Sequence, residues 1–302
     1  MRLSVLDAGS HAVSHVIADV EPGGVPTIVA SAKHPLRLGQ RISRSGVLDS
    51  AAVRDLVIAV RRAAHVSDRH HCDDFYAMGT AIIREAPNAN RIVRVIHRQT
   101  GVKLHFLPGE EEARLTFAAV RRWLGVPTAQ IVLLDIGGST TEVAWGTKVE
   151  PSLAVSLPLG AARLTRLWLP GMQPSSRSVR RLTAYIDEQL DLSVAHPAVA
   201  NAAYPVAASR TFQQLAELCR ARPDVKGRVW LKASDLRRWV PRLAEMTPSR
   251  RAKLPGISRA RAHQSLAGAI VADRLMRAFK LDAIAVSPVG LREGIMLERA
   301  ER

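Results

Sequence analysis

The sequence predicts an α/β protein built from two related halves. Two stretches, residues 3–17 and 132–145, carry this prediction, because each has the pattern of a β-hairpin of the same design. An apolar strand ends in an aspartate, Asp7 or Asp135, a glycine-containing turn follows, and a second apolar strand returns. Short apolar runs and amphipathic stretches of helical spacing alternate along the remaining chain, as expected of strands and helices.

The turn of the second hairpin has the composition of an anion-binding loop. Glycines let the backbone approach a ligand closely and allow positive φ, so that consecutive N–H groups converge on an anion. Asp135, at the strand end, is suited to hold a metal ion or its water, and Glu142 returns on the far side of the turn. Taken alone, this stretch is also compatible with an ordinary glycine-rich hairpin with solvated acids. The residues expected to contact the anion are Gly137, Gly138, Ser139 and Thr140.

The first hairpin repeats this design at the N-terminus, with Asp7 followed by Gly9, Ser10 and His11. Two such hairpins, one opening each half, resemble the two phosphate-binding hairpins of the actin-like ATPase superfamily. That resemblance implies a duplicated actin-like, ribonuclease H-like architecture. Two domains would then surround a phosphate-binding cleft, with Asp7 and Asp135 facing one another across it.

Composition limits the class of protein. The chain of 302 residues is long enough for two domains, each with its own core. A hydrophobic content of 47% and a charged content of 23% are typical of a globular protein. No apolar stretch reaches the roughly 20 residues needed to span a bilayer. No signal peptide is recognisable, so a cytoplasmic location is expected. The two cysteines, Cys72 and Cys219, lie far apart and are interpreted as structural thiols.

The charge is strongly basic. Lysine and arginine number 43 against 27 acidic residues, which gives a formal net charge of +16. Such a field favours polyanionic partners, although an arginine-rich composition typical of a GC-rich genome is the competing explanation. Aromatic residues make up only 4% and do not alternate with basic runs, so a nucleic-acid partner is not expected.

Periodicity predicts the remaining elements. The boundary between the halves is expected near residues 125–129, which gives an N-terminal domain of residues 1–125 and a C-terminal domain of residues 126–302. Strands are expected at residues 26–30, 32–38, 75–78, 103–107 and 283–286. Helices are expected at residues 50–64, 90–100, 110–120, 177–192, 211–219, 235–246, 263–279 and 290–299.

Two further segments of the first half carry chemistry. Residues 79–88 have the pattern of a strand-to-helix turn that presents Arg84 and backbone N–H groups to a phosphate. A helix then begins with three acids, Glu110, Glu111 and Glu112. Acids in a first turn also complement the helix dipole, which is the structural alternative. Because this helix leads straight to the second hairpin, we expect it to lie beside the cleft.

Several motifs together resemble the exopolyphosphatase / guanosine pentaphosphate phosphohydrolase (Ppx/GppA) family, and most closely its shorter actinobacterial exopolyphosphatase type. The resemblance covers nearly the whole chain. It rests on residues 7–12, 79–88, 109–115, 135–142, 156–161, 254–261 and 290–294.

The resemblance implies a hydrolase that releases terminal orthophosphate from inorganic polyphosphate. It assigns the general-base role to Glu112 and a catalytic role to Glu142. Carboxylates beside a polyanion require a cation, so Asp7, Asp135, Glu142 and Glu111 are expected to bind Mg²⁺. The phosphates would contact Gly9, Ser10, His11, Arg84 and the turn of the second hairpin. A homodimer fits the same resemblance.

The chain departs from the family pattern at Ile82, at residues 206–212, at residues 287–289 and in both phosphate-binding turns. His11 and Ala12 stand where an asparagine and a serine are expected, and Ser139 stands where a third glycine is expected. Guanosine pentaphosphate hydrolysis, and a paralogue that binds polyphosphate or a nucleotide without turnover, therefore stay open as alternatives. A sugar kinase or actin-like ATPase would need a glycine-rich adenosine loop after Thr211, and none is present.

Overall fold

The computed structural model describes residues 1–21, 23–43, 45–126, 129–194 and 204–302. The chain divides into two compact units, and each is described by itself. The first unit comprises Met1–Leu115 together with Leu291–Arg302, and the second comprises Thr116–Gly290.

The division differs from the predicted boundary near residues 125–129, of which 127–128 lie outside the described residues. Helix α4 (Gly109–Leu124) is continuous through the change of unit, so no linker marks it. The last helix, α11 (Leu291–Ala300), belongs to the first unit, because Gly294 packs directly on the α4 backbone. A Cβ on Gly294 would lie 2.1 Å from the carbonyl oxygen of Leu115.

The first unit contains a five-stranded sheet of order β3-β2-β1-β4-β5. Strands β1, β2 and β3 form an antiparallel meander, and β4 and β5 run parallel to β1. One continuous strand, β3, replaces the two predicted at residues 26–30 and 32–38, since its pairing with β2 continues through Ser31. The bounds are β1 Arg2–Ala8, β2 Ala12–Asp19, β3 Thr27–Pro35, β4 Asp74–Gly79 and β5 Leu104–Phe106.

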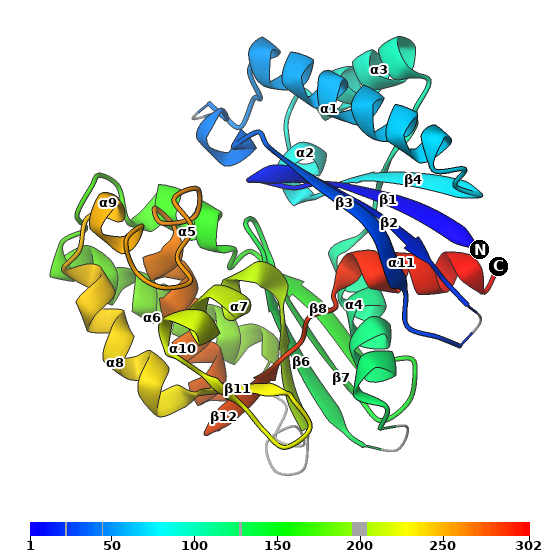
Figure 1. The fold of residues 1–302 in the computed structure, drawn as a ribbon. Coiled ribbons are helices and arrows are strands. Elements are labelled where there is room, and N and C mark those ends of the chain that lie inside the picture. The colour runs from blue at the N-terminus through cyan, green and yellow to red at the C-terminus, as the bar shows by residue number, and fades with distance from the viewer. Residues whose placement is uncertain (22, 44, 127–128, 195–203) are drawn as a thin grey trace. The chain divides into compact units, whose positions relative to one another are not determined.

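Helices cover both faces of this sheet. Figure 1 shows α1 and α3 on one side of β1 and β4, and α11 on the other. Leu6 and Ala8 of β1 and Val13 of β2 pack against the apolar face of α1. The bounds are η1 Leu38–Gln40, α1 Ser50–Arg69, α2 Ala81–Arg84 and α3 Ala89–Thr100.

The second unit contains a seven-stranded sheet of order β10-β11-β12-β9-β6-β7-β8. Its part β8-β7-β6-β9-β12 repeats the order and the strand directions of the first sheet, which confirms the predicted duplicated α/β fold. Strands β11 and β10 extend it. The bounds are β6 Ile131–Ile136, β7 Thr141–Gly146, β8 Leu153–Leu157, β9 Tyr204–Ala208, β10 Arg222–Pro223, β11 Val229–Lys232 and β12 Ala283–Val286.

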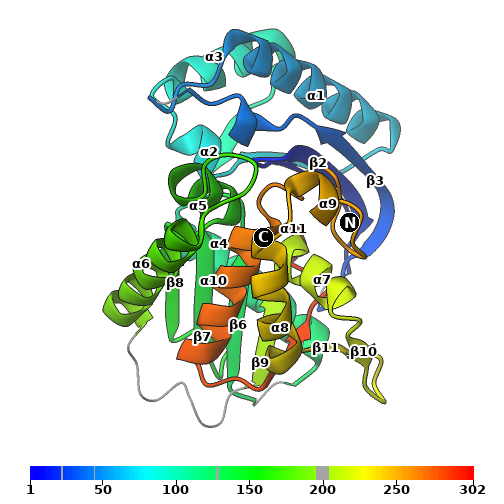
Figure 2. The ribbon, with the colours of Figure 1, turned by 90° about the vertical axis from the view of Figure 1, so that its left-hand side faces the viewer.

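Helix α10 (Ser265–Ala278) is the central core helix of this unit, as predicted for residues 263–279. Figure 2 shows it between α5 and α6 on one side and α8 on the other. Most of its residues are buried, so its sequence is apolar nearly all round. The bounds of the other helices are α5 Ala161–Trp168, α6 Ser176–Val194, α7 Ser209–Leu218, α8 Ala233–Ala244 and α9 Pro248–Arg251.

Candidate functional site

In the first unit, the predicted site residues gather where parallel strands end. Asp7 lies near the end of β1, Arg84 ends the short helix after β4, and Glu112 lies in the first turns of α4, which follows β5. Strands β1, β4 and β5 are parallel neighbours, so their carboxyl ends meet at one edge of the sheet. Ligands of open α/β sheets bind outside such an edge.

Backbone hydrogen bonds fix the turn of the first hairpin. The N–H of Gly9 donates to the carbonyl oxygen of Ala12 at 3.1 Å, which closes the turn. The carbonyl oxygens of Ser10 and His11 accept hydrogen bonds from the segment after β3. The donors are the N–H groups of Gly39 to Ser10, and of Leu36 and Arg37 to His11.

The two acids in the first turns of α4 have different partners. Both carboxylate oxygens of Glu111 accept hydrogen bonds from Arg114, at 2.6 and 2.7 Å. These bonds hold the pKa of the Glu111 carboxyl below its ordinary value. Glu112 is buried and accepts a hydrogen bond from Arg84 Nη1 at 3.2 Å. Glu112 is thus joined to the predicted phosphate-binding arginine, whereas a metal-binding role for Glu111 would compete with Arg114.

In the second unit, Asp135 and Glu142 are directly opposite one another in the β6–β7 pair. Residues opposite each other on antiparallel strands have Cβ atoms about 4.5–5.5 Å apart and lie on the same face. Glu142 is only 5% exposed, and its Oε1 accepts a hydrogen bond of 2.8 Å from the hydroxyl of Ser156 on β8. Two like charges in this arrangement repel one another, so the pair suits a bound cation.

The turn of the second hairpin is closed in the same way as the first, by the N–H of Gly137 donating to the carbonyl oxygen of Thr140 at 2.9 Å. The carbonyl oxygens of Gly137, Gly138 and Ser139 then accept hydrogen bonds from the N–H groups that begin α5. The donors are Gly160, Ala161, Ala162 and Arg163. The turn also carries N–H groups and hydroxyls, which are the groups that bind an anion.

The glycines of these turns do not serve through positive φ, which corrects the expectation from sequence. Neither Gly9 nor Gly137 has a positive φ. At Gly137 the constraint is space, because a Cβ would lie 3.0 Å from the carbonyl oxygen of Thr140. At Gly160 the constraint is severe: a Cβ would lie 2.1 Å from the carbonyl carbon of Ser139 and 2.4 Å from the nitrogen of Thr140.

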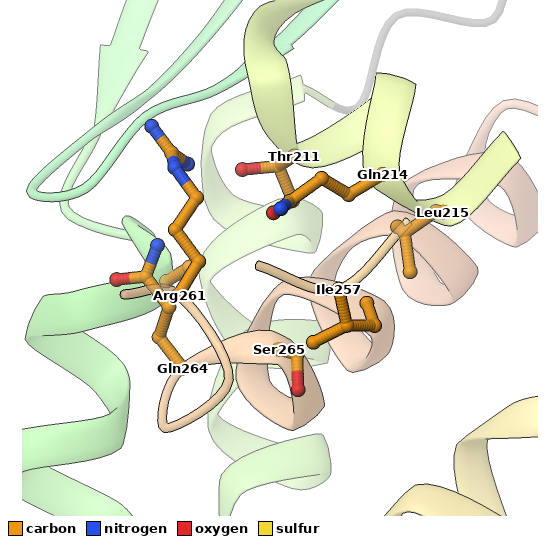
Figure 3. A pocket seen from close by; sticks show the side chains of 8 residues that line it. Thr211, Gln214, Leu215, Ile257, Arg261, Gln264 and Ser265 are labelled. Carbon is orange, nitrogen blue, oxygen red and sulfur yellow. The ribbon is translucent and has the colours of Figure 1, made fainter. Parts of the chain in front are cut away.

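A pocket lies beside the supports of the second hairpin (Figure 3). Figure 3 shows the hydroxyl of Thr211 and the amide of Gln214 directed toward the side on which Arg261 and Gln264 lie. Gln264 is 5% exposed, and its Oε1 has no hydrogen-bond partner within the described part of the chain. The lining residues are Ala161, Thr211, Gln214, Leu215, Ile257, Arg261, Gln264 and Ser265.

The described residues contain no group of three or more histidine, cysteine, aspartate or glutamate side chains arranged to hold a metal ion. A complete metal site therefore needs more than the Asp135–Glu142 pair, and Asp7 facing Asp135 stays a prediction.

Among the described residues, no helix has the length and apolar character that crossing a membrane demands.

Sequence patterns missed the residues that support the site. The hydroxyl of Thr80 donates to the carbonyl oxygen of Ala8, and that of Thr211 donates to the carbonyl oxygen of Ile136, each one residue after a hairpin aspartate. Ser156 and Gly160 lie within the matched motif at residues 156–161, which is the signal that could have identified them. Their roles depend on β8 and α5, neither of which the periodicity predicts.

The chain is similar to proteins of known family. Exopolyphosphatase 1 of Mycobacterium tuberculosis is 39% identical over 305 residues, which cover 100% of this chain and 89% of that protein. Exopolyphosphatase 1 of Mycobacterium leprae is 40% identical over 305 residues, with coverages of 100% and 90%. The solved structure of an exopolyphosphatase from Cytophaga hutchinsonii has the same fold, with a TM-score of 0.88 and 22% identity over 100% of this chain and 98% of that one. A model of the Ppx/GppA phosphatase family matches residues 16–302. The chain belongs to the Ppx/GppA phosphatase family, as its motifs predict.

Proposed function

We propose that the chain is an exopolyphosphatase, which releases terminal orthophosphate from inorganic polyphosphate by metal-assisted attack of water. The observation that carries the proposal is the repeated arrangement of an aspartate beside a turn that offers N–H groups, at Asp7 and at Asp135. Membership of a phosphatase family and full-length similarity to two proteins named exopolyphosphatase support it. The chain is accordingly a hydrolase acting on phosphoric anhydrides.

The two turns would hold phosphate oxygens. Gly9, Ser10 and His11 would do so in the first unit, through N–H groups and the serine hydroxyl. Gly137, Gly138, Ser139 and Thr140 would do so in the second, through N–H groups and hydroxyls. Arg84 would add a guanidinium, the group best suited to bind two phosphate oxygens at once. Hydrolysis of a phosphoanhydride depends mainly on such positioning and charge neutralisation.

Mg²⁺ is the cation that these oxygen donors suit. Asp135 and Glu142 would hold it together with Asp7, and Glu111 would join only by leaving Arg114. When bound, the ion neutralises phosphate charge and polarises the terminal phosphoryl group. The hydrogen bond from Ser156 keeps one oxygen of Glu142 fixed.

Glu112 would act as the general base. The water oxygen forms a bond to the terminal phosphorus, and one water proton passes to the Glu112 carboxylate. The bridging P–O bond breaks, and its electron pair leaves with the oxygen of the shortened chain. Glu142 would contribute to catalysis by holding the cation together with Asp135, which lies opposite it on the neighbouring strand. The hydrogen bond from Arg84 Nη1 holds the buried Glu112 carboxylate beside the proposed phosphate-binding guanidinium.

We infer polyphosphate rather than guanosine pentaphosphate as the substrate, because the relatives of 39% and 40% identity are both named exopolyphosphatases. The net charge of +16 suits a long polyanion.

A homodimer and a cytoplasmic location stay predictions. Sedimentation of the purified protein would test whether it is a homodimer.

Phosphate release decides between the alternatives. Purified protein is incubated with long polyphosphate, tripolyphosphate and guanosine pentaphosphate, with Mg²⁺ and with excess chelator. We expect Mg²⁺-dependent release from polyphosphate that exceeds release from the nucleotide. Faster release from guanosine pentaphosphate would reassign the substrate. Polyphosphate binding without release from any substrate would identify a paralogue that does not turn over.

A further inference from the structure

Arg84 and Glu112, to which the proposed function gives separate roles, contact one another in the first unit. Arg84 Nη1 donates a hydrogen bond to Glu112 Oε1 at 3.2 Å and another to the carbonyl oxygen of Leu107. The side chain of Glu112 is 9% exposed, whereas that of Arg84 is 27% exposed. The bond to Leu107 ties the guanidinium to the segment between β5 and α4. Arg84 thus stands between a buried carboxylate and solvent.

The remaining nitrogens of this guanidinium are available. Both side-chain hydrogen bonds of Arg84 use Nη1, and among the described residues its Nε and Nη2 have no hydrogen-bond partner. Nε and Nη2 form the side-on fork of a guanidinium, which binds two oxygens of a phosphate in parallel. A phosphate can therefore bind at this fork without displacing Glu112 from Nη1.

We propose that Arg84 is a positioning residue for the general base. Nη1 holds the Glu112 carboxylate while the Nε–Nη2 fork binds the terminal phosphate, so that one planar group sets the distance between the base and the phosphorus. The inference rests on the proposed function, since it concerns the same reaction. It adds that phosphate binding and base placement depend on a single side chain.

The chemistry requires such a fixed separation. A general base must lie within hydrogen-bond reach of the attacking water, which itself lies in line with the bond that breaks. A guanidinium is rigid, so two partners on different edges are held in one geometry. A lysine ammonium binds a phosphate as a point charge on a flexible stem and does not set the place of a second partner.

The test uses tripolyphosphate hydrolysis by the full chain with Mg²⁺, measured as kcat and KM. We expect Arg84→Lys to bind substrate with little change in KM and to lower kcat by about 10²-fold, since a misplacement of about 1 Å has that effect. Arg84→Gln should raise KM and also lower kcat, because it removes both the phosphate-binding fork and the group that holds Glu112. Arg94→Gln is the matched control, because it removes the same charge from the exposed face of α3.

Two results would overturn the proposal. One is Arg84→Lys with the kcat of the wild type, because a point charge would then suffice. The other is Arg84→Gln with a raised KM and the kcat of the wild type, because Arg84 would then only bind phosphate. If Arg84→Gln does not fold, as judged by thermal unfolding, Arg84→Lys decides alone. A wild type that releases no phosphate would instead refute the proposed function, and this inference with it.

Discussion

The two aspartate hairpins have the same turn but different supports. The N–H of Gly9 bonds to the carbonyl oxygen three residues on, and so does the N–H of Gly137. In the first unit, the carbonyl groups of the turn accept hydrogen bonds from the irregular segment after β3. In the second unit, they accept hydrogen bonds from the first residues of α5. One loop conformation can therefore be held by an irregular segment or by a helix N-terminus.

The second support is the tighter of the two. Gly160 lies against the backbone of Ser139 and Thr140 with no room for a Cβ. At Gly9, by contrast, a Cβ would lie 3.4 Å from its nearest neighbour, the carbonyl oxygen of Ala12, which is an ordinary contact. The second hairpin therefore has less freedom to adjust than the first, and substitutions should distinguish them.

The largest effect is expected from Gly160→Ala. The added methyl group would overlap the backbone of the turn, so either the turn or α5 must move. We expect a loss of about 3 kcal/mol in the free energy of unfolding, at the upper end of the usual cost of overpacking. Denaturant unfolding monitored by circular dichroism measures this loss. Gly9→Ala is the control and should change stability by less than about 1 kcal/mol. Equal losses for the two variants would show that the supports do not differ.

The interiors of the two hairpins differ as well. Behind the first hairpin, the buried side chains of Ser4, His15 and Ser67 share hydrogen bonds of 2.7–3.2 Å. Counted from the aspartates, the positions of Ser4 and His15 correspond in the second hairpin to Val132 and Val143, both buried and apolar. At these two positions the first hairpin therefore has a polar pair that includes a titratable histidine, whereas the second has apolar side chains.

This difference predicts a pH-dependent stability that originates in the first unit. Burial lowers the pKa of His15 from its ordinary 6.5 to about 4, with smaller contributions from His34 and His70. Between these values the unfolded chain binds more protons at this residue than the folded chain. The contribution of His15 to the free energy of unfolding is therefore fully present above about pH 6.5. About 2–3 kcal/mol of it is lost as the pH decreases toward 4.

Denaturant unfolding at pH 7 and at pH 4.5 tests this expectation, with His15→Val as the matched variant. Valine is the residue of the second hairpin, and it leaves the Ser4–Ser67 hydrogen bond of 2.7 Å in place. We expect the variant to lose clearly less stability between the two pH values than the wild type. An identical loss in both proteins would assign the effect to other groups.

The residues opposite the two aspartates give a third contrast. Asp7 faces Ser14, whereas Asp135 faces Glu142, whose carboxylate is held by Ser156. Removing a hydrogen bond to a buried charged group typically costs about 1.5–3 kcal/mol, so Ser156→Ala should lower kcat by about tenfold or more. Ser14→Ala should have a smaller effect. Steady-state kinetics with tripolyphosphate measures both variants. A fully active Ser156→Ala would show that Glu142 needs no support from β8.

Sequence patterns identified the parts of the site that are local in the chain. Asp135 and Glu142 face one another because a single tight turn joins their strands, and the pattern of residues 132–145 is enough to predict that hairpin. The supports depend on contacts between distant segments. Ser156 lies on a strand that the sequence does not predict, and Thr211 contacts a residue 75 positions away. The Arg84–Glu112 pair was missed for the same reason, since 28 positions separate its members.

The smallest effect concerns two equivalent threonines. Thr80 and Thr211 each donate a hydroxyl hydrogen bond to the residue after a hairpin aspartate, at 3.2 Å to Ala8 and 2.8 Å to Ile136. Thr211 is buried, whereas Thr80 is half-buried, and the carbonyl oxygen of Ala8 also accepts a hydrogen bond from the N–H of Thr80. We therefore expect Thr211→Val to cost about 1–2 kcal/mol in the free energy of unfolding and Thr80→Val about 0.5 kcal/mol. Denaturant unfolding of the two variants gives the difference directly. A larger loss for Thr80→Val would mean that the first hairpin, despite its irregular support, depends more on this hydroxyl than the second.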